Sequence, residues 1–256
     1  MNTDIQRLLN DLYLSHYTSN YHAHDNSSTI NIFMCLRNNS NTLPDTFKSL
    51  ETIENHFKNY NFSYFIFEND SSDNTPSLIN SFMKNRSGIF KCDTLHTHHW
   101  DSVKSIKRSS DMAHYRNSMK QLCSSWNNSS FSLILDSNVS FSIDTISDFL
   151  STLHSDPNIA MVTPFGFVHD SPHTYYDTYA LLTSSNKRYI PRFIPHILPV
   201  HSAFGGIVMI RSHALRNSSW NINPDVLESE HVSFCRDVRR FGSIVILKHT
   251  RVSWIP

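Results

Sequence analysis

The stretch Ser132-Leu133-Ile134-Leu135-Asp136-Ser137-Asn138 decides the fold that we predict for this chain. Its apolar part is short, as in a strand of a parallel sheet that is covered on both faces. Asp136 and Asn138 follow at the carboxyl end of that strand, where open α/β sheets bind their ligands. Side chains two positions apart in an extended segment point the same way, so this pair could hold a hard cation that carries phosphate. An Asx turn that ends the strand is the alternative.

Strand and helix patterns alternate on both sides of this stretch. Short apolar runs predict strands, and apolar residues at helical spacing predict the helices between them. The further strands are predicted at 29–36, 62–67, 88–92, 158–164 and 243–247. One helix is predicted to begin at Thr42 and another after Pro76. Three more helices are predicted at 111–126, 144–153 and 227–241. The last strand is expected to end before Lys248. This alternation indicates an α/β fold with a doubly wound, mostly parallel sheet.

The composition is that of a globular protein with one main domain. The chain has 256 residues, of which 39% are hydrophobic, and Lys plus Arg balance Asp plus Glu at 22 each. This balance provides no general attraction to nucleic acid, so no nucleic-acid partner is expected. We predict an N-terminal helix and linker at 1–28 and a single domain at 29–256, and the oligomeric state stays open.

The absence of recognisable targeting signals and the pattern of cysteines suggest a cytoplasmic protein. The first residues lack the basic region and apolar core of a signal peptide, and no apolar run reaches the roughly 20 residues of a membrane span. Cys35, Cys92, Cys123 and Cys235 form no CxxC pair. We therefore expect four reduced, buried thiols in a chain without a transmembrane segment.

Charged residues follow the predicted strands at positions where ligands bind. Glu68 and Asp70 come after the second strand and have no evident structural task, whereas Asp73 can cap the next helix. Arg116 lies near the start of a predicted helix, where it makes either a surface salt bridge or a contact to phosphate. The short basic run that includes Arg108 could also meet a diphosphate.

Two adjacent glycines mark another position of interest. Gly205 and Gly206 are two of only five glycines, and they precede an apolar run. Such a pair indicates a backbone that approaches a ligand or makes an unusual turn. The segment 165–199 before it is too long and irregular for a simple connection, so we expect it to line a pocket.

Taken in order, these features resemble nucleotide-sugar glycosyltransferases of the GT-A fold. They are similar to fungal-type α-mannosyltransferases and to related capsule or viral enzymes. The matching segments are Glu68-Asn69-Asp70-Ser71-Ser72-Asp73, Arg116-Asn117, Asp136-Ser137-Asn138 at the DxD motif, Gly205-Gly206 with Arg211, Glu230-His231 and a late histidine, His249. The resemblance covers about residues 29–256 and implies a GT-A domain that moves a sugar to a glycan hydroxyl.

The resemblance also implies roles for individual residues. The donor would be a nucleoside diphosphate sugar, and the cofactor Mn²⁺ or Mg²⁺. The base and ribose would be lined by Arg37, Asn38, Glu68 and Asp70, with Arg116, Asp136, Gly205 and Gly206 also contacting the donor. Asp136, Asn138 and His249 would bind the metal ion. Glu230 or His231 would deprotonate the acceptor if the reaction inverts, whereas a retaining reaction needs no such base, and Asp177 would contact the acceptor or the donor sugar.

Two departures from the family pattern keep alternatives open. Asn138 is neutral where the DxD motif ends in Asp, so metal binding should weaken, and His231 replaces the usual Asp after Glu230. A non-catalytic GT-A-like domain that binds a sugar nucleotide or a glycan is therefore the alternative. A nucleotidyltransferase ranks last, because it would need a Gly-rich, basic phosphate loop and 38–41 contains neither Gly nor Lys.

Overall fold

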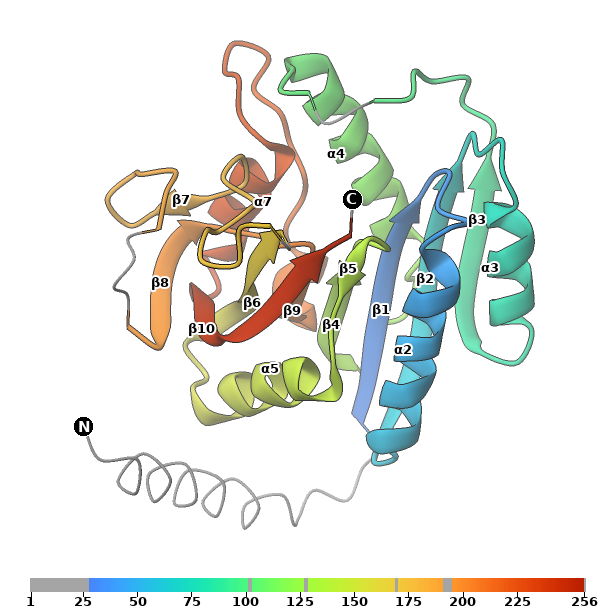
Figure 1. Ribbon diagram of the computed structural model, residues 1–256, viewed down its shortest axis with the longest axis horizontal. Helices are drawn as coiled ribbons and strands as arrows, with labels where there is room; N and C mark the ends of the chain where they lie inside the picture. Colours follow the sequence, from blue (N-terminus) through green and yellow to red (C-terminus); the bar gives the residue numbers. More distant parts are fainter. Residues whose placement is uncertain (1–27, 101–102, 127–128, 169, 191–194, 256) are drawn as a thin grey trace.

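The computed structural model describes residues 28–100, 103–126, 129–168, 170–190 and 195–255. Apart from Ser28, which begins the first strand, the helix and linker predicted at 1–28 lie outside this part of the chain. A mixed sheet crosses the molecule and carries helices on both faces (Figure 1). The α/β fold class predicted from the sequence is therefore confirmed.

The sheet contains ten strands in the described residues. Their order is β3-β2-β1-β4-β9-β6-β10-β8-β7, and β5 pairs with β10. The strands are β1 (Ser28–Leu36), β2 (Tyr60–Asn69), β3 (Ser87–Asp93), β4 (Ser129–Leu135), β5 (Val139–Ser140), β6 (Ile159–Val168), β7 (Leu182–Thr183), β8 (Ile197–Ser202), β9 (Ile207–Arg211) and β10 (Ser243–Trp254). Each strand predicted from an apolar run is present. Strands β1 and β4 are largely buried, whereas the edge strand β3 is mostly exposed.

The sheet is less parallel than a doubly wound pattern predicts. Strands β3, β2, β1 and β4 are parallel, but β9 lies antiparallel between β4 and β6, and β8 lies antiparallel to β10. Leu135 at the end of β4 pairs with Ile207 at the start of β9. The antiparallel strand therefore begins at the edge where β4 ends, and it brings the residues just before it to that edge.

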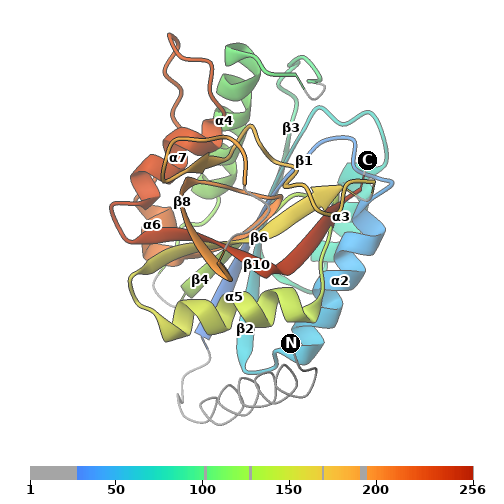
Figure 2. The same ribbon diagram turned by 60° about the vertical axis from the view of Figure 1, so that its left-hand side comes forward.

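Two apolar clusters fill the spaces above and below the sheet. One face is covered by α2 (Leu43–His56), α3 (Thr75–Met83) and α5 (Ile143–Ser155), and the other by α4 (Ile106–Gln121), α6 (Ser212–Arg216) and α7 (Glu230–Val238) (Figures 1 and 2). Leu43, Leu50 and Ile53 of α2 are buried, as the helical spacing predicts. The three layers leave the carboxyl ends of β4 and β6 at one edge.

The predicted bounds of three elements differ clearly from the structure. Helix α4 begins at Ile106 rather than 111 and ends before 122, because the Ser105 hydroxyl accepts the Arg108 N–H and caps the helix earlier. Helix α7 is shorter than 227–241, because Ser229 caps its start. Strand β10 continues past Leu247 to Trp254, and its pairing with β6 is irregular between Leu247 and Arg251.

The cysteines and helices test two further expectations. All four cysteines are free thiols, but Cys92 is exposed on the edge strand β3 and Cys35 is half-buried, so burial was wrongly predicted for these two. Alternate residues of an edge strand such as β3 face solvent, which explains Cys92. No helix within the described ranges is long and apolar enough to cross a membrane.

Candidate active site

The loop after β4 is held firmly at its backbone. The Asp136 N–H donates to the Gly206 carbonyl at 2.8 Å, which continues the pairing of β4 with β9 by one step. Ser137 is buried, and its carbonyl accepts the Thr46 hydroxyl of α2 at 2.8 Å. These bonds tie the loop to the neighbouring strand and to a helix on one face. The side chain of Asp136 is thereby placed at the carboxyl edge of the sheet.

The Gly205-Gly206 turn lies next to this loop and accepts the Asp136 N–H. Both residues have positive φ, +71° and +81°, which glycine adopts without strain. A Cβ atom on Gly206 would lie 2.3 Å from Val139 Cγ2 and 2.9 Å from Trp254 Cζ2. The positive φ angles confirm the unusual turn predicted for this pair, and close packing against Val139 and Trp254 requires glycine at 206. Contact of the backbone with a donor stays a prediction.

A buried arginine joins two carboxylates at this edge. Arg116 Nη2 of α4 lies 3.5 Å from Asp136 Oδ1, and its Nε donates to Glu230 Oε1 at 3.3 Å. Arg116 is 8% exposed and Glu230 is 3% exposed. Burial alone would lower the pKa of Arg116, but the two carboxylates raise it above its ordinary value. This arrangement is a buried ion-pair network, which neither reading of Arg116 from the sequence anticipated.

Opposing effects act on Asp136. Burial raises its pKa, the charge of Arg116 lowers it, and the charge of Glu230 raises it again, so that the net shift is upward. Arg108 also lowers it. A carboxylate in this environment gains stability from any additional cation that reaches it.

His231 is buried, and both its ring nitrogens and its ring face contact other side chains. Its Nε2 lies 3.4 Å from Glu230 Oε1, and the indole N–H of Trp220 donates to its Nδ1 at 3.5 Å. The ring stacks on Phe204 with 3.9 Å between centroids. Burial and the charge of Arg116 hold its pKa well below the ordinary value. His231 is therefore a neutral ring with both nitrogens occupied.

Trp220 and Phe204 contact His231 but were not predicted as residues of the site. Asn117 is the one signal, because it stands next to Arg116 and its side chain bonds the backbone of Trp220 at both the N–H (3.1 Å) and the carbonyl (2.7 Å). Trp220 is fully buried and stacks on Phe234 of α7. Arg116 thus pairs with the two carboxylates, and Asn117 holds the backbone of Trp220.

Asp177 lies against the same turn from the segment between β6 and β7. Its Oδ2 accepts the Gly205 N–H at 3.1 Å, and its Oδ1 accepts the Ala180 N–H at 3.3 Å. The pKa of Asp177 is raised to about 6, mainly by burial. The two hydrogen bonds oppose this rise, and the charges of Glu230 and Asp136 add to it. The Gly205-Gly206 turn therefore links Asp177, which accepts the Gly205 N–H, to Asp136, whose N–H donates to the Gly206 carbonyl.

The four residues expected at the base and ribose have structural partners. Asp70 accepts the backbone N–H groups of 95–97, and Arg37 donates to the carbonyls of Thr97 and His98. Glu68 accepts the Ser71 N–H at 2.8 Å. The absence of a structural task for Glu68 and Asp70 was therefore wrongly inferred. Glu68 holds the turn at Ser71, and the sequence does not show that the loop at 95–97 folds onto Asp70.

Asn38 has a similar role in the neighbouring turn. It has a positive φ of 53°, and its Oδ1 accepts the Ser72 N–H at 2.8 Å. Arg37, Asn38, Glu68 and Asp70 together hold the loops that follow β1, β2 and β3. These loops lie at the same edge of the parallel block as Asp136.

His249 does not join Asp136 and Asn138. Its Nε2 lies 3.5 Å from Asp148 Oδ2 of α5, beside the irregular part of β10. His249 was therefore wrongly predicted as a metal ligand, because the irregular pairing turns it toward the helix. Across the ranges that the structure describes, no group of three or more His, Cys, Asp or Glu side chains could hold a metal ion.

Arg211 is another residue of the matching segments that lies elsewhere. It donates to the carbonyls of Leu153 and Asp156 at the end of α5 and to that of Ile159. It therefore closes the end of a helix.

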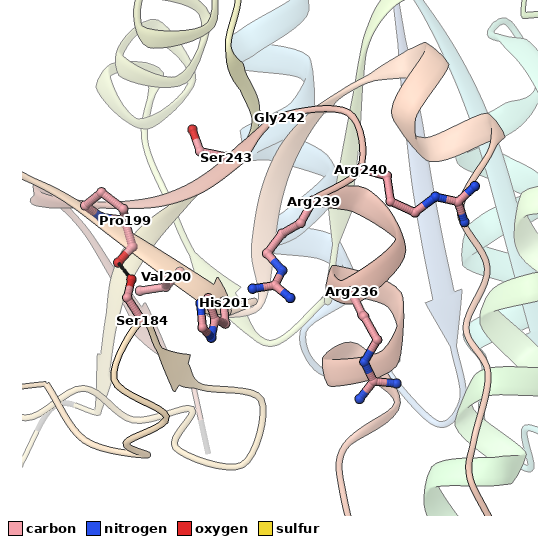
Figure 3. A pocket seen from close by; sticks show the side chains of 9 residues that line it. All are labelled: Ser184, Pro199, Val200, His201, Arg236, Arg239, Arg240, Gly242 and Ser243. Atoms are coloured by element: carbon pink, nitrogen blue, oxygen red, sulfur yellow. Dashed lines mark hydrogen bonds between the residues drawn. The ribbon is translucent and has the colours of Figure 1, made fainter.

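At the other end of α7 from Glu230, an open cavity of about 500 Å³ is lined by Ser184, Pro199, Val200, His201, Arg236, Arg239, Arg240, Gly242 and Ser243 (Figure 3). None of the predicted site residues lines it.

A family model and solved structures match this chain. The family described as Cryptococcal mannosyltransferase 1 matches residues 29–237. No curated protein sequence gives a significant match. The family match spans the strands and helices that carry Arg116, Asp136 and Glu230.

Three solved structures share the fold at low sequence identity. Mannosyltransferase PcManGT from Pyrobaculum calidifontis, in complex with GDP-Man and Mn²⁺, is 10% identical with a TM-score of 0.56, over 94% of this chain and 63% of that one. TarS 1–349 of S. aureus in complex with UDP is 13% identical with a TM-score of 0.60, over 89% and 60%. Glucosyl-3-phosphoglycerate synthase from Mycobacterium tuberculosis, in complex with Mg²⁺ and UDP, is 9% identical with a TM-score of 0.54, over 95% and 75%.

These similarities establish the fold expected from the resemblance, a GT-A domain. The chain spans about three fifths of the length of the first two solved structures.

Proposed function

The chain belongs to the family described as Cryptococcal mannosyltransferase 1, and from that premise we propose that it transfers a sugar from a nucleoside diphosphate sugar to a glycan hydroxyl. The observation that carries this proposal is the buried network in which Arg116 joins Asp136 to Glu230 at the carboxyl edge of the sheet. Taking three charges out of water costs several kcal/mol per ion unless they are well paired. A network of this kind at the ligand-binding edge is expected of a catalytic site.

Mannose is the sugar that we propose, with GDP-mannose as its donor. The family description supports mannose, and the Pyrobaculum calidifontis neighbour was solved with GDP-Man. In the proposed reaction, the bond between the anomeric carbon and the diphosphate oxygen breaks, and the diphosphate leaves with the electron pair. The acceptor oxygen forms the new bond to the anomeric carbon and gives up its proton.

Asp136 and Asn138 are the residues that we propose to hold Mn²⁺ or Mg²⁺. Asp136 offers a half-buried carboxylate, and the backbone of Asn138 is fixed because its carbonyl accepts the Ile255 N–H at 2.8 Å. Such cations often take only one or two protein carboxylates and complete their shell with substrate phosphate and water, so this donor set fits. When bound, the cation supplies positive charge next to the leaving diphosphate.

Glu230 is the group that we propose as the base if the reaction inverts. Its Oε2 accepts only the Ser229 hydroxyl, at 3.3 Å, among the described residues, so it keeps capacity for the acceptor proton. His231 suits this role less, since the Trp220 indole occupies its Nδ1 and its Nε2 faces Glu230. We therefore assign His231 to orienting Glu230. If the reaction retains configuration, the leaving diphosphate can take the proton.

Asp177 completes the proposed site as a contact to the acceptor or the donor sugar. Both of its oxygens already accept backbone N–H groups, which fixes the carboxylate and leaves further lone pairs for sugar hydroxyls. On the nucleotide side, we propose that Arg37, Asn38, Glu68 and Asp70 shape the pocket for the base and ribose by holding the loops around it.

A thermal-shift series with nucleotide sugars tests this proposal. GDP-mannose, GDP-glucose, UDP-glucose and UDP-N-acetylglucosamine would each be added with Mn²⁺ and with EDTA. At 100 times its dissociation constant a ligand stabilises the folded state by about 2.7 kcal/mol. We expect GDP-mannose with Mn²⁺ to raise the melting temperature most. No shift with any nucleotide sugar would contradict the proposed function, and a preference for a UDP sugar would contradict the proposed donor.

A further inference from the structure

Arg108 is a cation near the catalytic network that has no partner of its own. Its Nε is buried and makes no hydrogen bond, and its side chain forms no ion pair with any residue that the structure describes. An unpaired buried donor of a charged group is costly, because the group has lost water and gained nothing in return. The neighbouring charged residue behaves differently, since Lys107 is largely exposed and pairs with Asp111.

The charge of Arg108 reaches the site from α4. It lowers the pKa of Asp136, and it contributes to holding the pKa of His231 low. The hydroxyl of the next residue, Ser109, donates to the Glu228 carbonyl at 2.9 Å, so the first turn of α4 packs beside the segment that leads into α7. The turn of α4 that carries Arg108 therefore contacts the segment that leads to Glu230 and His231.

The two arginines of α4, Arg108 and Arg116, differ in the number of guanidinium N–H donors that already have a partner. Arg116 is already engaged by Asp136 and Glu230. Arg108 lies eight residues earlier, which keeps it within the broad stripe of a helix that faces one way. A guanidinium has five N–H donors in a planar fork that matches the oxygens of a phosphate. In the described part of the chain, only Arg108 of these two has its donors free.

We propose that Arg108 binds the diphosphate of the donor and stays bound to the nucleoside diphosphate that leaves. This inference rests on the proposed function, because it assigns a residue to the leaving group of that reaction. The ligand is a diphosphate oxygen, and the contact is a charge-assisted hydrogen bond. The bond also becomes stronger as negative charge accumulates on the diphosphate oxygen during departure.

Binding of GDP and GMP to the purified chain tests the assignment. Calorimetry would be run in EDTA, so that no metal ion bridges the phosphates, on the wild type, Arg108→Ala and Lys107→Ala. We expect Arg108→Ala to weaken GDP about tenfold and to leave GMP within about twofold, because the two nucleotides share the base and ribose. Lys107→Ala should leave both affinities unchanged. UDP and UMP would be measured as a second pair.

The outcomes separate this inference from the function on which it rests. If the wild type binds neither diphosphate, in EDTA or with added Mn²⁺, the proposed function is wrong. If the wild type binds GDP and Arg108→Ala binds it equally well, or loses GDP and GMP in parallel, the assignment of Arg108 is wrong. Arg108→Gln, which keeps the length and polarity of the side chain, replaces Arg108→Ala if the latter does not fold. It should show the same selective loss of GDP.

Discussion

The guanidinium of Arg116 lies 3.5 Å from the carboxylate of Asp136, although 20 positions separate the two residues and they come from a helix and a strand end. The contact is buried, and the same arginine donates to Glu230. Three elements, α4, β4 and α7, therefore meet through one side chain. This relationship makes Arg116 the residue on which both the stability and the chemistry of the site depend.

Replacement of Arg116 by Ala should destabilise the protein as well as inactivate it. The change leaves two carboxylates in a buried position without their cation, and removal of one partner of a buried ion pair typically costs about 3–5 kcal/mol. Urea unfolding measures the loss. Arg86→Ala is the matched control, since Arg86 pairs with Glu51 and Glu54 nearer the surface. Equal losses for the two variants would contradict the buried network.

Trp220→Phe should lower activity while keeping the fold. Phenylalanine preserves the aromatic stack on Phe234, which has 4.0 Å between ring centroids, but it has no N–H for His231 Nδ1. Without that donor the neutral ring can carry its proton on Nδ1 instead of Nε2, so NMR of ¹⁵N-labelled histidine should show a change of tautomer at His231. The His231→Gln variant identifies the signal. We expect the melting temperature to fall by several degrees, because the smaller ring loses one hydrogen bond and leaves a cavity at a fully buried position.

Trp126→Phe is the control for this substitution, because Trp126 stacks on Phe33 away from His231. An unchanged His231 spectrum in Trp220→Phe would show that the indole does not set its protonation. A wild-type spectrum in which Nδ1 carries the proton would contradict the geometry directly.

The stability of Asp177→Asn should differ from the wild type in its dependence on pH. The pKa of Asp177 is raised to about 6 from an ordinary value of 3.8. Its contribution is therefore fully present below pH 3.8 and is lost as the pH rises through about 6. The wild type should lose up to about 3 kcal/mol relative to Asp177→Asn between pH 4 and pH 7. Asp225→Asn, at an exposed position, should follow the wild type throughout, and a constant difference for Asp177→Asn would refute the raised pKa.

His249→Ala should leave the metal dependence of activity unchanged. His249 contacts Asp148 of α5, so its loss removes a surface contact worth less than about 1 kcal/mol. Asn138→Asp, in contrast, adds a carboxylate beside Asp136 and should reduce the Mn²⁺ concentration for half-maximal activity about tenfold. Titration of activity with Mn²⁺ compares the variants. A requirement for much more Mn²⁺ in His249→Ala would restore His249 as a ligand.

The strands and the residues at their ends could be predicted from the sequence, but most of the contacts between them could not. Local patterns predicted β1, β2 and β4, because a buried strand must be a short apolar run. They also indicated Asp136, because a strand end is a local feature, whereas Glu230 was indicated by the resemblance to a known family. His249 was misplaced because an irregular pairing of β10 turns it away, and nothing in the neighbouring residues encodes that irregularity.

The partners of the site residues depend on distant parts of the chain. Trp220 meets Asn117 across 103 positions, and Asp70 meets Thr97 only because a loop folds back onto β2. Such contacts follow from the packing of the whole sheet and its helices. The sequence therefore indicated Arg116, Asp136 and Glu230, which the structure brings into one network, but it could not show their partners or the contribution of Trp220.

The release of GDP from GDP-mannose in the presence of Mn²⁺ and a mannose-containing glycan tests the central claim most directly. The wild type and Asp136→Asn would be compared at equal concentration, after their melting temperatures have shown that both are folded. We predict that the wild type releases GDP with matching growth of the glycan and that Asp136→Asn loses at least a hundredfold of this rate. Equal rates in the two proteins, or wild-type binding of GDP-mannose without any release, would contradict the proposed catalytic site.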